Sequence, residues 1–326
     1  MNQILVIGSS NSDMVIITER LPCPGETIVS GTYMGNPGGK GANQAVAAAR
    51  LGGAVTFISK RGNDLFGNQS LGLLMREGIN TQYVIKDTEH PSGIALITVD
   101  AKGRSTSVTA PGANRFLFPE DIPENIFENG KYDILLLQLE IPFITVEYSA
   151  KLAVKNNIKV ILNPAPVQKI SDELYKNLWL ITPNSTEAEI LTGVKVHDIL
   201  SAERATRFFH DKGVKNVIIT LGSSGAFVRI ADYSVIIPAI KVKVVDITAV
   251  GDVFNGALAV ALAEGNNFED AIIFANKAAS IAATRLGAQA SAPYKNEVIN
   301  LQSDLYDKSY VNFSPSINQK RVMLGF

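Results

Sequence analysis

The sequence predicts an α/β protein with a mostly parallel central sheet that helices cover on both faces. Short apolar runs alternate along the chain with longer segments of helical periodicity. The runs are apolar at nearly every position, which is typical of strands buried on both faces of a parallel sheet. Two further pairs of segments break this alternation and are predicted to form hairpins.

The predicted elements follow one another in a regular order. Central strands are expected over residues 4–7, 55–59, 134–138, 159–162, 178–182, 217–220 and 226–229, with another over 236–245. Helices are expected over 42–51, 66–77, 144–156, 185–192, 202–212, 253–263 and 268–285. The two hairpins pair 14–19 with 26–33 and 92–100 with 103–109, the second turning at 100–103.

Bulk composition narrows the class of protein. With 326 residues and 46% hydrophobic residues the chain can bury a large core, and an α/β chain of this length often forms one domain. The net charge of −1 does not favour nucleic acid or a membrane surface. The single cysteine, Cys23, excludes an internal disulfide and fits a reducing, cytoplasmic location. No apolar run reaches membrane-spanning length, and His90, His197 and His210 lack metal-ligand spacing.

A short turn near the C-terminus carries an acid into the start of a helix. Residues 246–252 read Asp-Ile-Thr-Ala-Val-Gly-Asp and precede an apolar helix. The first turn of a helix offers free N–H groups and partial positive charge to an anion. Such a turn can neutralise a transferring phosphoryl group while Asp252 takes a proton from a hydroxyl, as a small-molecule kinase needs. Alternatively, Asp252 only caps its helix, and the turn alone does not decide.

A glycine-rich segment near the N-terminus also opens a helix. Gly38, Gly39 and Gly41 leave the backbone exposed, while Lys40 and Asn43 bring donors to the same place. Met34 and Gly41 exclude a P-loop, and the spacing is not that of a dinucleotide fingerprint. A tight turn before a small-residue helix and a polyol-binding turn both fit this segment.

Taken together, the two segments resemble the ribokinase-like carbohydrate kinases. The chain carries G-G-K-G-A-N-Q-A at 38–45 and D-x-T-A-x-G-D-x-F-N-G-A at 246–257. Seven further motifs match in order, at 8–13, 24–27, 137–140, 163–166, 182–187, 219–225 and 284–289. The resemblance implies one kinase domain over residues 1–303. The hairpin strands near 14–34 and 92–109 would form a small β-sheet lid inserted in that domain. Residues 304–326 would be a C-terminal extension of unknown role.

The function that the resemblance implies is ATP-dependent phosphorylation of D-ribose at its 5-hydroxyl, giving D-ribose 5-phosphate. Other small polyols remain open as substrates: 2-deoxyribose, a nucleoside or fructose. A non-catalytic sugar-binding protein is a further alternative, which the intact Asp252, Gly251, Glu187 and Lys40 argue against. The family also implies a homodimer through the lid sheet.

The resemblance assigns roles residue by residue. Asp252 would be the catalytic base, and Ala249, Val250 and Gly251 would complete an anion hole with it. The sugar contacts would be Asn11, Asp13, Gly39, Lys40, Asn43, Glu140 and Asp252. Nucleotide contacts would be Asn184, Glu187, Thr220, Leu221, Gly222, Ser223, Ser224, Gly225, Gly251 and Asn276, with Mg²⁺ ordered through water by Glu187.

A monovalent cation, K⁺, is also implied. Its ligands would be the side chain of Asp246 and carbonyls near Thr248, Ala282, Arg285 and Gly287, with Ser291 nearby. Three positions depart from the family pattern: Val250 replaces Ala or Gly, Ile247 replaces Thr, and Ser185 replaces an acid. Asn11 is a further point of interest, because related deoxyribose kinases carry an apolar residue there.

Overall fold

The computed structural model describes residues 2–102, 104–128, 130–230, 233–301 and 312–313. The predicted C-terminal extension, 304–326, lies outside the described residues except for two positions in a short edge strand. Within the described part of the chain, no helix combines the length and apolar character needed to cross a membrane.

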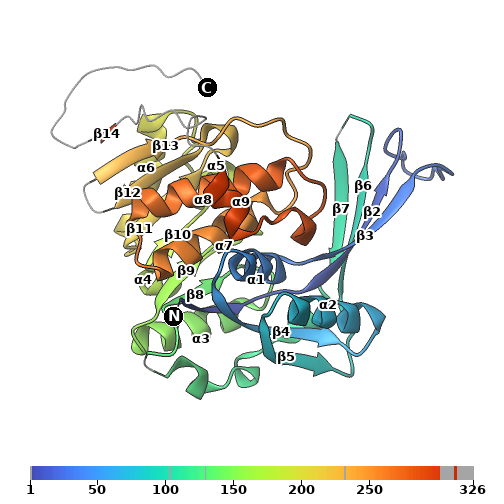
Figure 1. The fold of residues 1–326 in the computed structure, drawn as a ribbon, viewed down its shortest axis with the longest axis horizontal. Coiled ribbons are helices and arrows are strands. Elements are labelled where there is room, and N and C mark those ends of the chain that lie inside the picture. The colour runs from blue at the N-terminus through green and yellow to red at the C-terminus, as the bar shows by residue number, and fades with distance from the viewer. Residues whose placement is uncertain (1, 103, 129, 231–232, 302–311, 314–326) are drawn as a thin grey trace.

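A ten-stranded sheet forms the centre of the molecule (Figure 1). The strand order is β14-β13-β12-β11-β10-β9-β8-β1-β4-β5. The strands from β5 to β11 are parallel, and β12, β13 and β14 add an antiparallel edge. Their bounds are β1 Gln3–Ile7, β4 Ala54–Gly62, β5 Asn80–Asp87, β8 Ile134–Leu137, β9 Lys159–Leu162, β10 Leu180–Ile181, β11 Asn216–Thr220, β12 Ala226–Ile230, β13 Tyr233–Ile237 and β14 Asn312–Phe313.

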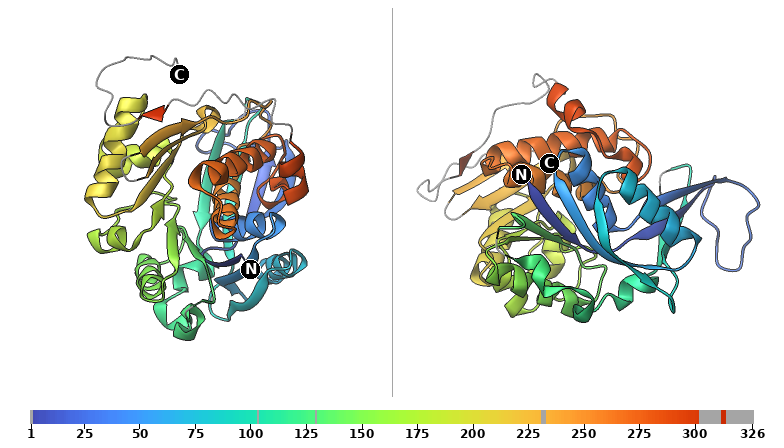
Figure 2. Two further views of the ribbon diagram at one scale, coloured as in Figure 1. Left: turned by 60° about the vertical axis from the view of Figure 1, so that its left-hand side comes forward. Right: turned by 60° about the horizontal axis from the view of Figure 1, so that its bottom comes forward.

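Helices cover both faces of this sheet, as Figure 2 shows. Successive residues of β1 point to opposite faces of the sheet. Ile4 and Val6 pack in the core beneath α1, α7 and α8. Leu5 and Ile7 pack in the core beneath α3, α4 and α6. The prediction of a parallel sheet covered on two sides is therefore confirmed. The helices are α1 Lys40–Arg50, α2 Leu65–Arg76, α3 Phe143–Lys155, α4 Asp172–Asn177, α5 Ser185–Thr192, α6 Ile199–Asp211, α7 Val250–Ala263, α8 Phe268–Ala283 and α9 Lys295–Asn300.

A second, four-stranded sheet projects from the side of the core and is the predicted lid (Figure 1). Its order is β3-β2-β6-β7, with two antiparallel hairpins joined by the parallel pair β2 and β6. The bounds are β2 Asn11–Ile17, β3 Thr32–Gly38, β6 Gly93–Val99 and β7 Ser105–Ala110. Three residues separate β1 from β2, so the lid joins the core directly at the end of a central strand.

Two predicted strands are wrong in extent. The first hairpin was expected to return over 26–33, but β3 begins at Thr32. Gly25 and Gly31, with φ of 82° and 119°, give the preceding segment a left-handed backbone that a strand does not have. The other strand of this hairpin was expected to begin at residue 14, but β2 begins at Asn11, so Asn11 and Asp13 both lie on the strand.

The strand expected over 236–245 is also wrong, because β13 ends at Ile237 and residues 238–249 contain neither helix nor strand. Pro238 has no N–H to donate to a neighbouring strand. Further along, the N–H groups of Val245 and Asp246 bond to the carbonyl of Ala283 at the end of α8. The approach to the Asp252 turn is thus held by a helix end and not by sheet pairing.

Two glycines of α7 have different surroundings, because Gly256 packs against α1 whereas Gly251 faces open space. A Cβ at Gly256 would lie 2.8 Å from both the Ala47 Cβ and the Gln44 carbonyl oxygen of α1, whereas one at Gly251 would meet no atom within 4 Å. Overpacking a close helix contact typically costs about 1–3 kcal/mol. We expect Gly256→Ala to be less stable than Gly251→Ala by about that amount in chemical denaturation. Equal stability of the two variants would contradict this close α1–α7 contact.

Candidate active site

The predicted sugar and phosphate residues converge on Lys40, at the first position of α1. Its ammonium group is buried among Asp252, Glu140, Glu187 and Asp13. Attraction to Asp252 is the largest influence on the pKa of Lys40, and together with the other carboxylates it raises this pKa although burial alone would lower it. Side chains from the N-terminal, middle and C-terminal parts of the chain therefore meet at one point.

The glycine-rich turn packs directly against the lid strand. Gly39 has φ of 89°, and a Cβ there would lie 2.7 Å from the main-chain nitrogen of Asn11. The turn presents the N–H of Lys40 to Glu140, whose Oε2 accepts at 3.0 Å. The Ser9 hydroxyl donates to the same oxygen at 2.5 Å. Glu140 is thus oriented at the start of α1, where the helix dipole favours an anion.

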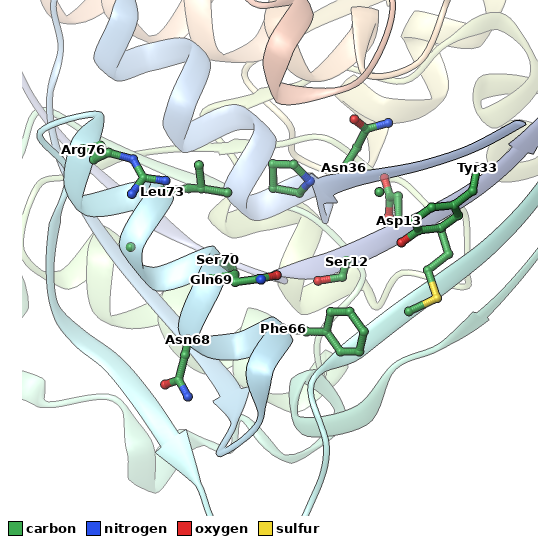
Figure 3. A pocket seen from close by; sticks show the side chains of 14 residues that line it. Ser12, Asp13, Tyr33, Asn36, Phe66, Asn68, Gln69, Ser70, Leu73 and Arg76 are labelled. Carbon is green, nitrogen blue, oxygen red and sulfur yellow. The ribbon is translucent and has the colours of Figure 1, made fainter.

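Asp13 lies on the lid side of the site. Burial raises the pKa of its carboxyl to about 6, and repulsion from Glu140 and Asp252 adds to the effect. The carboxyl borders a hollow of about 440 Å³ between β2, β3 and α2, which Figure 3 shows from close by. An acid whose charge is costly therefore lies close to two other carboxylates in this structure.

Asn11 is oriented by a second asparagine. Asn114, which is buried in the short 3-10 helix Gly112–Phe116, accepts from the N–H of Ser10 at 2.9 Å and donates to the Ser10 carbonyl at 3.2 Å. This pairing with the main chain defines the orientation of the Asn114 amide. The same amide nitrogen donates to Oδ1 of Asn11 at 2.8 Å. Asn11 is thereby left with its NH₂ group to offer a ligand.

Asp252 lies in the first turn of α7 and is 5% exposed. Its Oδ2 accepts from Asn43 and its Oδ1 from Gln44, each at 3.0 Å. The N-cap residue of the helix is Ala249, and no side chain caps this end. The interpretation of Asp252 as a simple helix cap therefore does not hold.

The turn before α7 leaves main-chain donors exposed to a ligand. Ala249 has the left-handed φ of 58°, a strained conformation for a residue with a Cβ and one often found at functional sites. The N–H groups of Gly251 and Asp252 have no hydrogen-bond partner within the described residues. Open space at Gly251 lies beside these donors. The arrangement can hold an anion next to the Asp252 carboxylate.

The predicted nucleotide residues gather on neighbouring loops. Asn184 caps α5 by accepting from Glu187 N–H at 2.8 Å, and the Glu187 carboxylate accepts from Asn184 N–H at 2.9 Å. Asn184 also pairs with Thr220 as an isolated parallel bridge, and residues 221–225 follow as a loop with the 3-10 turn Gly222–Ser224. Burial raises the pKa of Glu187. A smaller hollow of about 190 Å³ adjoins Leu221.

Asn276 has a different place from the other predicted nucleotide residues. It is buried on α8, and its amide nitrogen donates to the carbonyls of Ile237 and Pro238, both at 3.1 Å. These bonds fix the chain where it leaves β13 beside the 221–225 loop. A direct contact of Asn276 with nucleotide stays a prediction.

The predicted cation residues form an oxygen-rich junction. Asp246 accepts through Oδ1 from the Thr248 N–H at 2.9 Å and hydroxyl at 2.7 Å, and through Oδ2 from the Gly287 N–H at 2.9 Å. Burial alone would raise the pKa of Asp246, but these hydrogen bonds together lower it. The Ala282 carbonyl bonds to the Arg285 N–H, and Ser291 is buried nearby in the chain.

A carboxylate together with main-chain carbonyl groups suits a monovalent ion in its chemistry. The printed contacts join Asp246 to Thr248 and Gly287, and a K⁺ site at this junction stays a prediction. Among the residues that the structure describes, no group of three or more His, Cys, Asp and Glu side chains is placed to hold a metal ion. A divalent ion would therefore have to complete its shell with water or with a bound phosphate.

Comparison with known proteins agrees with this geometry. The model of the pfkB family carbohydrate kinases matches residues 1–295, and the chain belongs to that family. It is 45% identical to the ribokinase of Haemophilus influenzae, over 91% of this chain and 97% of that protein. It is 38% identical to the deoxyribokinase of Salmonella typhi, over 89% and 95%. The solved structure of Arabidopsis thaliana ribokinase complexed with ribose and ATP superposes with a TM-score of 0.86 at 33% identity, covering 92% of this chain and 98% of that one.

Sequence reasoning left several polar residues of the quoted motifs without a role. The structure buries five of them beside Asp252: Gln44, Gln138, Asn163, Thr182 and Asn255. Each lies inside one of the matched motifs. For Gln138, Asn163 and Thr182 the signal is a neutral polar residue directly after an apolar strand, and for Gln44 and Asn255 it is an amide inside an apolar helix.

The pKa of Asp13 predicts a pH dependence of stability. Its folded-state pKa is about 6 against an ordinary value of 3.8, so the folded protein binds more protons between these values and loses stability as pH rises through them. Each unit corresponds to about 1.4 kcal/mol. We expect Asp13→Asn to be more stable than the unmodified protein by up to about 3 kcal/mol at about pH 7.5, and the gain to vanish near pH 4.

Urea denaturation across this pH range measures the effect, and Asp211→Asn, an exposed acid at the end of α6, is the control. A gain that is the same at both pH values would contradict a raised pKa of Asp13 in the folded protein.

Proposed function

We propose that this chain is an ATP-dependent kinase that transfers a phosphoryl group to the 5-hydroxyl of D-ribose. The observation that carries the proposal is the start of α7, where the Asp252 carboxylate lies beside the free N–H groups of Gly251 and Asp252. A base and an anion-binding turn on the same helix end are what phosphoryl transfer to an alcohol requires. Similarity to ribokinases over nine tenths of the chain supports ribose as the acceptor.

Asp252 takes the proton of the acceptor hydroxyl, and the N–H groups of the turn stabilise charge on the phosphoryl oxygens. Asn43 holds Oδ2 of Asp252, which restricts the carboxylate to one orientation. Bound Mg²⁺ would neutralise phosphate charge, with the half-buried Glu187 as the residue that holds its water shell. K⁺ would bind at the Asp246 junction and stabilise the turn from behind.

Ribose is favoured over 2-deoxyribose because of Asn11. The bond from Asn114 occupies Oδ1 of Asn11 and leaves its NH₂ group to donate to a sugar oxygen. Asp13, Glu140 and Asp252 supply acceptors for the hydrogens of other hydroxyls. The resemblance to a deoxyribokinase makes 2-deoxyribose the second candidate substrate.

The lid supports a homodimer as the assembly. One face of its sheet exposes Ile16 (45%), Tyr33 (61%), Leu96 (56%) and Val108 (74%), and cross-strand pairing places them on the same side. Exposed apolar groups in a contiguous row are typical of an interaction surface. A second copy of the lid is the partner that the family suggests, and the cytoplasm stays the predicted location.

The direct test is turnover of ATP against a panel of pentoses, hexoses and nucleosides, with Asp252→Asn as the diagnostic variant. Asp252→Asn keeps the size of the side chain and removes its basicity. General-base catalysis contributes about 10²–10⁴-fold, so kcat with ribose should fall by at least that factor while sugar binding persists.

Asp211→Asn serves again as the control and should retain full activity. Turnover of the Asp252→Asn variant close to that of the unmodified enzyme would exclude Asp252 as the base. A panel in which another acceptor greatly exceeds ribose would exclude ribose as the preferred substrate.

Replacing Asn11 tests sugar selectivity. Asn11→Met removes the donor and offers an apolar surface, and loss of a buried hydrogen-bond partner costs about 1–3 kcal/mol. We expect the ratio of kcat/KM for ribose to that for 2-deoxyribose to fall by about 5- to 150-fold. If this ratio is unchanged, Asn11 does not recognise the 2-hydroxyl.

The cation junction predicts a response to K⁺. At fixed Mg²⁺ and matched ionic strength, activity should be higher in K⁺ than in a buffer containing only a large organic cation. Asp246→Ala removes the only carboxylate among the predicted ligands and should abolish this difference, because the remaining groups are neutral at the ion. Equal activity of the unmodified enzyme in the two buffers would overturn the K⁺ site.

A further inference from the structure

Five buried polar side chains surround the Asp252 turn without belonging to the predicted ligand contacts. They are Gln44, Gln138, Asn163, Thr182 and Asn255, and we call them the amide network. Each is no more than 7% exposed. They come from α1, the end of β8, the end of β9, the end of β10 and α7, so they connect the central strands to both helices of the site.

The first half of the network holds the Asp252 carboxylate. Gln44 donates through Nε2 to Oδ1 of Asp252 at 3.0 Å and to Oδ1 of Asn163 at 3.1 Å. Its own Oε1 accepts from Gln138 at 2.6 Å. Turning the Gln44 amide over would place its oxygen against a carboxylate oxygen at the same short distance. Gln44 is therefore committed to donate to Asp252.

The second half returns to the neighbouring residue of the same helix. Asn163 donates to the Thr182 carbonyl at 3.3 Å, and the Thr182 hydroxyl donates to Oδ1 of Asn255 at 2.6 Å. Asn255 in turn donates to the Gly251 carbonyl at 2.8 Å. A continuous path of hydrogen bonds thus leaves α7 at the Asp252 side chain and rejoins it at the Gly251 main chain.

We propose that the amide network positions the base and the anion-binding turn together. It keeps Asp252 aimed at the acceptor hydroxyl through Gln44, and it fixes the peptide before Asp252 through Thr182 and Asn255. Gln44 and Thr182 are positioning residues, because they act on the reacting atoms only through Asp252 and Gly251. The inference rests on the proposed kinase function and assigns a role to motif residues that it leaves unexplained.

The neutrality of the network matters for this role. Lys40, Asp13, Glu140 and Glu187 already surround Asp252 with charge. A charged side chain in place of these amides would require desolvation of another ion and would change the electric field at the transferring phosphoryl group. Amides and a hydroxyl supply directed hydrogen bonds without net charge, and in a buried site such bonds strengthen one another.

Gln44→Met is the main test, because methionine has similar length but donates no hydrogen bond. We expect kcat to fall by about 10- to 100-fold, the effect of a small misplacement of a reacting group, with KM for ribose changed by less than about 3-fold.

Asn216→Leu is the matched control. Asn216 is another buried amide, which donates to the Trp179 carbonyl at 2.9 Å, at the opposite end of β11 from the site. This variant should lose stability like Gln44→Met but retain kcat and KM for ribose. A kcat that falls equally in both variants, or in neither, would overturn the proposal.

Thr182 gives an independent test should Gln44→Met fold poorly. Thr182→Val keeps the shape and removes the hydroxyl, so kcat should fall by about 10-fold, and Thr182→Ser should restore it. In a double-mutant cycle, the loss of kcat in the double variant should be smaller than the product of the two single losses. Both substitutions break the same path of hydrogen bonds. Full multiplicativity, or a Thr182→Val enzyme with unchanged kcat, would contradict a shared network.

These outcomes are distinct from failure of the proposed function. An unmodified enzyme that does not phosphorylate ribose removes the function, whereas an active one with a silent Gln44→Met removes only the network.

Discussion

The site depends on placing three acids around one lysine beneath a lid. Asp13, Glu140 and Asp252 come from the lid, the core sheet and α7, and Lys40 lies among them at the start of α1. Like charges this close are tolerated because Lys40, the N–H groups of the glycine-rich turn and the amides beside Asp252 compensate them. The pKa of Asp13 is raised mainly by burial, and repulsion from Glu140 and Asp252 adds to the effect. Sugar hydroxyls, which donate to carboxylates, would offset both.

Two kinds of electrostatic environment meet at the start of α7. One side of Asp252 faces the charged group around Lys40, and the other faces neutral amides that are closed off from solvent. The helix begins without a side-chain cap and with Ala249 in a left-handed conformation. An uncapped N-terminus normally loses stability, so the turn is maintained by its surroundings and keeps its N–H groups for a ligand.

Local sequence patterns predicted the central strands because burial on both faces makes each run continuously apolar, as in β1 and β8. They failed over 238–245, where alternating Lys and Val residues resemble a strand, but the chain bonds instead to the end of α8. They also started the first lid strand at residue 14, because a strand that follows β1 after only three intervening residues has no local marker. The motifs identified Asp252 and Lys40 as candidate site residues. Gln44 and Thr182 are connected to the site only by contacts between segments that are distant in the sequence.

The central claim is that this geometry delivers phosphate to one particular hydroxyl. ³¹P and ¹³C NMR of the product formed from uniformly ¹³C-labelled ribose and ATP tests it most directly. The account predicts a single phosphorylated product, with phosphorus coupling to the terminal carbon C5 and its neighbour, formed at least about 10²-fold more slowly by the Asp252→Asn enzyme. Coupling at C1, or phosphate released to water with ribose unchanged, would contradict it.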